Sequence, residues 1–283
     1  MQAVDVDQLA QLADFLDRHR NVLVLTGAGL STASGIPDYR DQDGVRRGRA
    51  PIQGPDFRKD EAVQRRYWSR SMVGWPTLAQ ATPNAAHYAL ARLEAAGRIG
   101  AIITQNVDGL HQRAGTRQLI ELHGNIHGVL CLQCRAIHPR AEIQQWLLAH
   151  NPELAANATS ADADSVVPEV RPDGDAEVEL AAMQRFHMPL CRHCGGTLQP
   201  DVIFFGDNIP PERTAAALAL AEQADALLVV GSSLMVFSGF RFCKLAAAAG
   251  KPIAAINLGK TRADDLISLK LAASAADVLP RLL

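Results

Sequence analysis

Two pairs of cysteines carry the strongest chemical signal in the sequence. Cys131 and Cys134 form one Cys-x-x-Cys pair, and Cys191 and Cys194 form the other. Four thiolates in two such pairs are the ligands that a tetrahedral structural zinc ion takes, and they leave no open position for a catalytic water. The 56 residues between the pairs exceed the common spacing of roughly 15–20. His193 lies inside the second pair and is an alternative ligand.

A glycine-rich loop at residues 26–31 is a candidate phosphate-binding loop. Gly27 and Gly29 follow an apolar run, and they allow a tight turn and a close approach of the backbone to a diphosphate. Ser31 and Thr32 add hydroxyl groups for phosphate oxygens, although Thr32 stands where a third glycine is usual. A glycine turn that only packs against its neighbours is the alternative.

Three further polar segments could face the same ligand. Residues 36–40 (Ile-Pro-Asp-Tyr-Arg) bring a carboxylate and a cation just after the glycine loop, or form a solvated turn. Asn106 and Asp108 follow an apolar run and point to the same side of an extended chain, where they could hold a ribose or form an Asx turn. His123 could be a general base, or a structural histidine.

Alternating strands and helices are predicted around these motifs, and they favour an α/β fold with a doubly wound, Rossmann-like parallel sheet. Continuous apolar runs predict strands that are covered on both faces. Residues 41–55, rich in Gly, Arg and Asp, are expected to form a mobile loop. The predicted strands are 21–25, 100–104, 226–230 and 252–256, and the predicted helices are 4–20, 61–73, 84–96, 212–223 and 240–249.

Composition narrows the classes of function. The net charge is −2 and the pI is about 6.5, which argues against a nucleic-acid-binding or membrane-surface protein. No apolar run is long enough to span a bilayer, and the N-terminal segment lacks the pattern of a targeting signal. Cys243 is the remaining cysteine and is expected to be a buried core thiol. This cysteine usage favours a reducing, cytoplasmic location.

Taken together, the motifs resemble the sirtuin (Sir2) family of NAD-dependent protein deacylases. The long spacing between the cysteine pairs, Tyr67-Trp68 and residues 73–76 (Val-Gly-Trp-Pro) look most like the class II, mitochondrial sirtuin-4-like branch. The segments that carry the family resemblance occur in the family's order and cover nearly the whole chain: 27–31, 35–40, 105–108, 122–124, both cysteine pairs, 200–207, 231–234 and 257–259.

The resemblance implies a division of the chain. Residues 1–128 and 200–283 would form the NAD-binding domain, with a helical part of the small domain within about 41–85. Residues 129–199 would form an inserted zinc-binding module, with a flexible insert at about 149–175. One structural zinc ion and NAD are the implied cofactors.

The resemblance also implies a reaction. An acyl-lysine protein and NAD would give nicotinamide, free lysine and O-acyl-ADP-ribose, with His123 as general base and Asn106 and Asp108 in the catalytic pocket. The peptide would lie between residues 204–206 and residues 236–239, in contact with Val202, Phe204, Phe205, Gly206 and Val236. The implied NAD contacts are Gly27, Ala28, Gly29, Ser31, Thr32, Ile36, Pro37, Asp38, Tyr39, Arg40, Gln105, Asn106, Val107, Asp108, Gly231, Ser232, Ser233, Asn257, Leu258, Gly259 and Ala275.

The acyl group and the type of transfer stay open at this point. Tyr67 and Arg70 match the spacing with which desuccinylating relatives bind acidic acyl groups, or they are ordinary residues of a helix surface. Deacetylation is the default expectation. The alternatives are protein mono-ADP-ribosyl transfer, an NAD- or ADP-ribose-binding regulatory module and, least favoured, a nucleic-acid-binding zinc ribbon.

Overall fold

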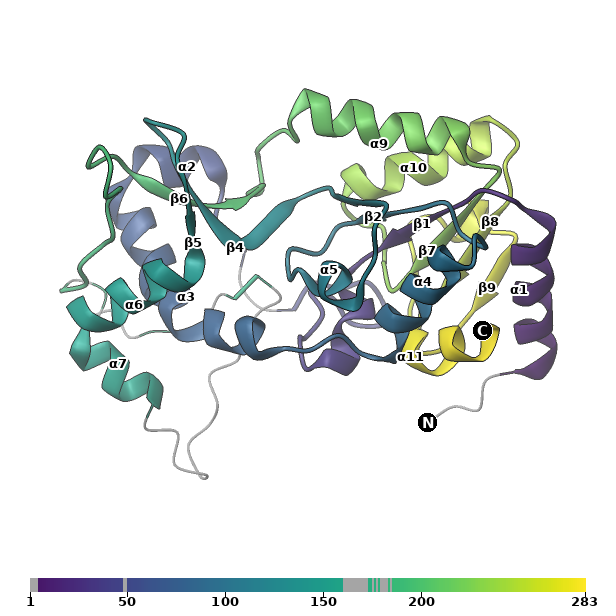
Figure 1. Ribbon diagram of the computed structural model, residues 1–283, viewed down its shortest axis with the longest axis horizontal. Coiled ribbons are helices and arrows are strands. Elements are labelled where there is room, and N and C mark those ends of the chain that lie inside the picture. The colour runs from purple at the N-terminus through teal and green to yellow at the C-terminus, as the bar shows by residue number, and fades with distance from the viewer. Residues whose placement is uncertain are drawn as a thin grey trace.

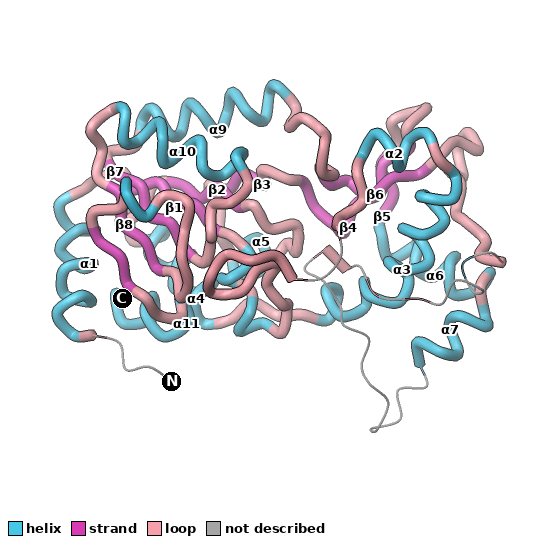
Figure 2. Tube along the Cα trace, turned by 180° about the vertical axis from the view of Figure 1, so that it is seen from behind, coloured by secondary structure: helices cyan, strands magenta, loops and turns pink. Residues whose placement is uncertain are grey.

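The protein has two lobes that lie side by side along its longest axis (Figure 1). The computed structural model describes residues 5–47, 50–159, 173–174, 176, 178, 183 and 185–283. The larger lobe contains a six-stranded sheet and the smaller lobe a three-stranded sheet, which Figure 2 shows from behind. None of the helices in these ranges is both long and apolar enough to cross a membrane.

The larger lobe is built on a parallel sheet, as the alternating apolar runs predict. The strand order is β3-β2-β1-β7-β8-β9, and every neighbouring pair is parallel. From β1 the sheet extends on one side through β2 and β3, and on the other side through β7, β8 and β9. Doubly wound sheets bind ligands at the carboxyl ends of the strands where the strand order reverses in this way, here at β1. The strands are β1 (Val22–Thr26), β2 (Ala101–Thr104), β3 (Leu119–Glu121), β7 (Ala226–Val230), β8 (Ile253–Ile256) and β9 (Leu269–Leu271).

Helices cover both faces of this sheet, because its strands are apolar on both sides. Val22 and Val24 face a core shared with α1 (Val6–Arg18), α4 (Ala85–Ala95), α11 (Ala275–Val278) and η4 (Leu279–Leu282). Leu23 and Leu25 face a second core shared with α9 (Pro211–Gln223) and α10 (Phe237–Ala248). Cys243 lies fully buried in that second core, as its sequence context predicts.

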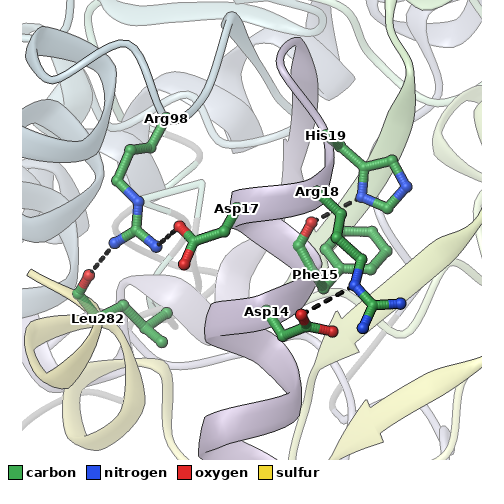
Figure 3. Close-up of polar contacts among 7 residues, drawn as sticks. All are labelled: Asp14, Phe15, Asp17, Arg18, His19, Arg98 and Leu282. Atoms are coloured by element: carbon green, nitrogen blue, oxygen red, sulfur yellow. Dashed lines mark hydrogen bonds and ion pairs between the residues drawn. The ribbon is translucent and has the colours of Figure 1, made fainter.

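Polar contacts fasten the N-terminal and C-terminal elements to the same edge of the lobe (Figure 3). The Arg98 guanidinium donates to Asp17 of α1 and to the carbonyl oxygen of Leu282. Within α1, Arg18 pairs with Asp14 at 2.8 Å, one helical turn away. Asp5 caps the start of α1, where its carboxylate accepts a hydrogen bond from the amide of Asp7. The helix is two residues shorter at each end than the predicted 4–20.

The smaller lobe combines an antiparallel sheet, ordered β5-β4-β6, with helices from two parts of the chain. Its core contains Phe57, Trp68, Met72, Leu147 and Phe186. The strands are β4 (Gly124–Cys131), β5 (Ile137–Pro139) and β6 (Leu198–Val202), and the helices are α2 (Gly54–Lys59), α3 (Glu61–Gln80), α6 (Arg140–His150) and α7 (Pro152–Thr159). The short helix α5 (Leu110–Ala114) follows β2.

Helix α3 differs from its predicted extent, 61–73, because it continues through Gly74 and Pro76 to Gln80. Gly74 has a packing role. A Cβ there would lie 2.2 Å from the carbonyl oxygen of Gly174, so only glycine lets that segment approach the helix. The Arg70 Nε donates to the carbonyl oxygen of Ala176 at 2.7 Å on the same side.

The boundaries expected for the zinc module fall inside strands. β4 begins at Gly124, before the expected start at 129, and β6 ends at Val202, after the expected end at 199. Residues 149–159 of the expected flexible insert are largely helical, in α6 and α7. Residues 160–172 and 175 lie outside the described residues.

Candidate active site

A cavity of about 650 Å³ contains most of the predicted site residues. Its walls come from the carboxyl ends of β1, β2 and β7, from the 36–47 loop and from the β6 end of the smaller lobe. Pro37 and Arg70 are the two predicted site residues, apart from the four cysteines, that do not line it. The predicted residues that line it are Gly27, Ala28, Gly29, Ser31, Thr32, Ile36, Asp38, Tyr39, Arg40, Tyr67, Gln105, Asn106, Val107, Asp108, His123, Val202, Phe204, Phe205, Gly206, Gly231, Ser232, Ser233, Val236, Asn257, Leu258, Gly259 and Ala275.

Two glycine turns interlock at the floor of this cavity. Gly27 N donates to Val230 O at 3.1 Å, and Gly29 N donates to Gly231 O at 2.8 Å. Gly231 has a φ of +60°, and a Cβ there would lie 2.3 Å from the amide nitrogen of Leu30. The glycines therefore pack closely, as the alternative interpretation of this loop expects, and they also keep side chains out of the cavity.

A buried polar network joins the glycine loop to the end of β2. Ser31 Oγ donates to Asp108 Oδ2 at 2.7 Å, and Asn106 Nδ2 donates to Ser31 Oγ and to Gly27 O, both at 3.1 Å. Asp108 Oδ1 also accepts from the Leu110 amide at 3.0 Å, so the Asx-turn interpretation holds as well. The network fixes an amide and a carboxylate at the cavity wall.

His123 reaches the cavity from the turn between β3 and β4. Its Nδ1 lies 2.9 Å from the carbonyl oxygen of Gln105, which can only accept, so Nδ1 carries the proton. Its Nε2 then accepts from Ser238 Oγ at 2.8 Å. Burial lowers the pKa of His123, outweighing the hydrogen bond to Gln105 that raises it, and the positive charges of Arg213 and Arg241 lower it further. The imidazole is therefore neutral, with a basic nitrogen in the cavity.

Apolar side chains form the opposite, outer part of the cavity. Phe205, Val236 and Phe237 remain 37%, 37% and 53% exposed at its mouth. Arg58 makes two hydrogen bonds to the carboxylate of Asp207, at 2.9 and 2.5 Å, beside this mouth. Exposed apolar groups that flank a cavity are typical of a surface that binds another molecule.

The 36–47 loop is fastened to the turn after β8. Lys260 N donates to Gln42 O at 2.7 Å, and Lys260 Nζ pairs with Asp43 at 3.0 Å. Arg40 Nη1 donates to Gly44 O at 2.9 Å within the loop. These contacts, called the loop clasp below, close one side of the cavity in a segment that the sequence predicts to be mobile.

The four predicted metal ligands converge in the smaller lobe. Their sulfur atoms all lie within 4.8 Å of one another, with Cys131 Sγ 3.5 Å from Cys194 Sγ and Cys134 Sγ 3.7 Å from Cys191 Sγ. Four converging sulfurs fit a tetrahedral zinc ion. His193, the alternative ligand, groups with His138 and Cys191, and His138 Nε2 lies 3.3 Å from Cys191 Sγ.

Some cavity residues escape sequence reasoning. Ser238 and Arg241 line the cavity and lie on α10, which begins at Phe237 rather than at the predicted residue 240. The family resemblance places Ser238 only in the segment 236–239 that would contact the peptide. The sequence does not indicate that Ser238 contacts His123 or that Arg241 lines the cavity. Asp207 also lines the cavity, and its partner Arg58 is far away in the sequence.

Comparison with known proteins agrees with this geometry. The model of the Sir2 family matches residues 27–238. The NAD-dependent protein deacetylase 2 of Bradyrhizobium diazoefficiens is 53% identical over 261 residues, covering 92% of each chain. An NAD-dependent protein deacetylase of Xanthomonas campestris pv. campestris is 50% identical over 268 residues, covering 95% of this chain and 88% of the relative.

Solved structures give the same result for the fold. A Sir2 structure with a p53 peptide and NAD+ superimposes with a TM-score of 0.75 at 30% sequence identity, covering 97% of this chain and 96% of the other. A Sir2 bound to an acetylated peptide gives a TM-score of 0.73 at 29% identity, with the same coverage. The chain therefore belongs to the Sir2 family.

Proposed function

We propose that this protein is an NAD-dependent protein lysine deacylase and that acetyl-lysine is its substrate. One observation carries the proposal: a neutral His123 presents Nε2 to a cavity that also holds the Ser31, Asn106 and Asp108 network. The relatives at about 50% identity are named NAD-dependent protein deacetylases, and the solved relatives bind acetylated, propionylated and p53 peptides.

The cavity fits NAD. Gly29 and Gly231 approach so closely that a side chain at Gly231 would clash with the Leu30 backbone, which leaves a smooth floor for a dinucleotide. The glycine loop and Ser31 would hold the diphosphate, Gly231 to Ser233 and residues 257–259 the adenosine half, and Gln105 to Asp108 the nicotinamide end. NAD, when bound, supplies the ribose that receives the acyl group and the nicotinamide that leaves.

The protein's own residues would then orient the reactants and move one proton. Nε2 of His123 would take a proton from a hydroxyl group that displaces Ser238 Oγ from its present position. Gln105 O would hold the imidazole in the required tautomer throughout. Because burial lowers the pKa of His123, the midpoint of the fall in rate on acidification should lie below the ordinary histidine pKa.

The zinc site has a structural role in this proposal. Four cysteine ligands leave no open position for a water molecule, and the site lies away from the cavity lining. Residues 1–128 and 200–283 are assigned to NAD binding, with a helical part of the small domain within about 41–85 that contains α2 and α3, and residues 129–199 are assigned to the zinc module. All five thiols are free, which suits the reducing cytoplasm that the cysteine usage favours.

We also propose that the chain belongs to the class II, mitochondrial sirtuin-4-like branch, on the long spacing between the cysteine pairs, Tyr67-Trp68 and residues 73–76. For the acyl group, Tyr67 lines the cavity but Arg70 does not, and Arg70 Nε is bound to Ala176 O at 2.7 Å. A carboxylate in the cavity therefore lacks an evident contact with Arg70, which favours acetyl over succinyl as the preferred group.

Nicotinamide release from NAD tests the proposal. Wild-type protein should release nicotinamide with an acetyl-lysine peptide and much less without a peptide. His123→Ala should lower the rate by roughly 10²–10⁴-fold, the usual contribution of a general base. His150→Ala, which changes an exposed histidine on α6, is the matched control and should retain the rate.

Other outcomes would redirect the assignment. Equal release with and without peptide would favour ADP-ribosyl transfer. NAD binding with no release under any condition would favour a regulatory binding module. Faster release with succinyl-lysine than with acetyl-lysine would contradict the preferred acyl group while leaving the reaction type intact.

A further inference from the structure

Two arginines bring positive charge close to His123. Arg213 lies on α9 and Arg241 on α10, and both charges act on the imidazole of His123. Within the described ranges, neither forms an ion pair, and the buried Nη1 of Arg213 and Nε of Arg241 have no acceptor. A buried guanidinium nitrogen without an acceptor is unfavourable, so a ligand that supplies one would be bound selectively.

Glu121, the acid whose titration the charge of Arg213 affects, does not serve as this partner. Glu121 feels the charge of Arg213, but its carboxylate accepts from Asn125 Nδ2 at 2.7 Å and from Gln112. Burial raises the pKa of Glu121, which is the direction expected for a carboxyl group without a close ion pair. Within the part of the chain that the structure describes, neither arginine beside His123 therefore has a carboxylate in a close ion pair.

The position of Arg241 indicates where its ligand comes from. Arg241 lines the cavity one helical turn after Ser238, the residue that contacts His123. Its guanidinium carbon lies 5.9 Å from the ring centre of Phe237, which is 53% exposed. Arg241 is thus at the mouth of the cavity, whereas the interlocked glycine turns that would receive the NAD diphosphate are at its floor.

We propose that Arg241, assisted by the field of Arg213, selects substrates with an acidic side chain close to the acyl-lysine. An acyl-lysine that reaches His123 must pass this mouth, so its neighbours in the peptide would pass Arg241. A planar guanidinium donates two parallel hydrogen bonds to a carboxylate. An amide in place of the carboxylate, or a lysine in place of the arginine, cannot reproduce this pair. The inference rests on the proposed deacylase function and names its substrate class.

A peptide series tests it. Acetyl-lysine peptides carry glutamine at every flanking position, and a single Glu is then placed in turn from two residues before the acetyl-lysine to two after it. Wild-type protein should show kcat/KM about tenfold higher with Glu than with Gln at one or two positions, in line with a charge-assisted hydrogen bond. Raising the salt concentration should reduce this ratio.

Variants test whether Arg241 causes the higher kcat/KM with Glu than with Gln. In Arg241→Gln the Glu-to-Gln ratio should fall to about one, and in Arg213→Gln it should fall only in part. Arg241→Lys should keep part of the ratio, because the charge remains without the planar fork. Lys244→Gln removes an equal charge from an exposed position on the same helix and should leave the ratio unchanged.

Three results would overturn the inference. They are a ratio near one in wild-type protein, a ratio that survives Arg241→Gln, and a preference that follows a carboxylate on the acyl group instead of the flanking residues. An unchanged ratio together with a higher KM for NAD in Arg241→Gln would assign Arg241 to the diphosphate, which also contradicts it. Absence of nicotinamide release with every peptide would instead contradict the proposed function.

Discussion

The two lobes hold their functional groups in different ways. In the larger lobe, β1, β2, β7 and β8 are completely buried and form a continuous apolar core with the helices on both faces. The smaller lobe packs a fully buried Arg140 between the rings of Trp68 and Trp75, at 5.5 and 4.8 Å. Gln144 and Ser71 accept from that guanidinium, and neither carries a compensating charge.

This difference implies that the lobes depend on different sources of stability. A large sheet covered on both faces buries enough apolar surface to be stable by itself. A three-stranded sheet with a buried cation gains less from its core, and small domains of this kind commonly need a metal or a disulfide. We therefore expect the stability of the larger lobe to depend on its backbone packing and the stability of the smaller lobe to depend on bound zinc.

Removing the metal should have the largest effect. Cys131→Ser removes a ligand that lies fully buried at the end of β4. Structural zinc sites supply apparent binding free energies of roughly 10–16 kcal/mol, so loss of one ligand should unfold much of the smaller lobe and abolish deacylation. Zinc content and hydrogen exchange measure this, with protection lost over β4 to β6 and retained over β1, β2 and β7.

Cys243→Ser is the matched control for that experiment. Cys243 is buried in the core beside α10, and burial raises the pKa of its thiol to about 12, so it has no thiolate for a metal. The variant should bind as much zinc as the wild type. Equal loss of protection in both lobes of Cys131→Ser would show that they fold as one unit and do not depend on different sources of stability.

A backbone change should have the next largest effect, and in the larger lobe. Gly231→Ala places a Cβ 2.3 Å from the Leu30 amide at a φ of +60°, so the interlocked turns must separate. The cost should be at least about 3 kcal/mol, and NAD binding should be lost with it. Gly250→Ala has a similar φ of +67° but open space around it, so it should cost only about 1 kcal/mol.

Urea unfolding and NAD titration of the two variants distinguish the strain of a left-handed backbone from the steric clash between the Cβ of residue 231 and the Leu30 amide. If Gly231→Ala and Gly250→Ala were equally destabilised, the left-handed backbone alone would explain the effect. The close contact between the two glycine turns would then have no energetic role.

Much of this comparison is visible in the sequence, because it depends on local patterns. Continuous apolar runs predict the strands β1, β2, β7 and β8, since a strand covered on both faces must be apolar throughout. The Cys-x-x-Cys spacing predicts the metal ligands because each tight turn presents two sulfurs. The family resemblance adds the proposed roles of Asn106, Asp108 and His123, which spacing alone leaves open and which stay predictions.

Other features depend on contacts between distant segments and are not visible in the sequence. Helix α3 continues past Gly74 to Gln80, and Gly174, a hundred residues further along the chain, occupies the space that the missing side chain of Gly74 leaves. Ser238 meets His123 only because α10 begins at Phe237, whose preceding residues offer no side-chain cap to mark the start. The segment around Asp43 is polar enough to predict a mobile loop, yet Lys260 fastens it from 217 residues away.

Acid should weaken the larger lobe through two buried histidines. His111 Nε2 meets the Thr26 hydroxyl at 3.0 Å, and its Nδ1 is buried with no acceptor for a second proton. Burial lowers the pKa of His111 to about 3 and that of His87 to about 4. The unfolded chain therefore binds more protons than the folded protein between pH 4 and the ordinary value near 6.5, so stability rises with pH in that window.

The expected size follows from linkage. Each histidine should cost about 1.4 kcal/mol per pH unit below about 6.5, so the pair should cost about 2–3 kcal/mol between pH 7.5 and 5.5. Urea midpoints at the two pH values measure the loss. His111→Asn should remove about half of the contribution of this pair to the pH dependence, and His150→Asn, at an exposed position, should remove little. An unchanged slope in His111→Asn would assign the acid sensitivity to other groups.

The loop clasp should show the smallest effect, because its ion pair is exposed. Lys260 and Asp43 have side chains that are 70% and 72% exposed, and such pairs contribute roughly 0.2–1 kcal/mol. Lys260→Gln should therefore raise the KM for NAD by no more than about threefold, since the Lys260 amide still donates to Gln42 O. The effect should vanish at high salt, where the pair is screened. A tenfold or greater rise in the KM for NAD that persists in high salt would mean that Lys260 contacts NAD itself. The position of the 36–47 loop would then depend on bound NAD instead of on the loop clasp.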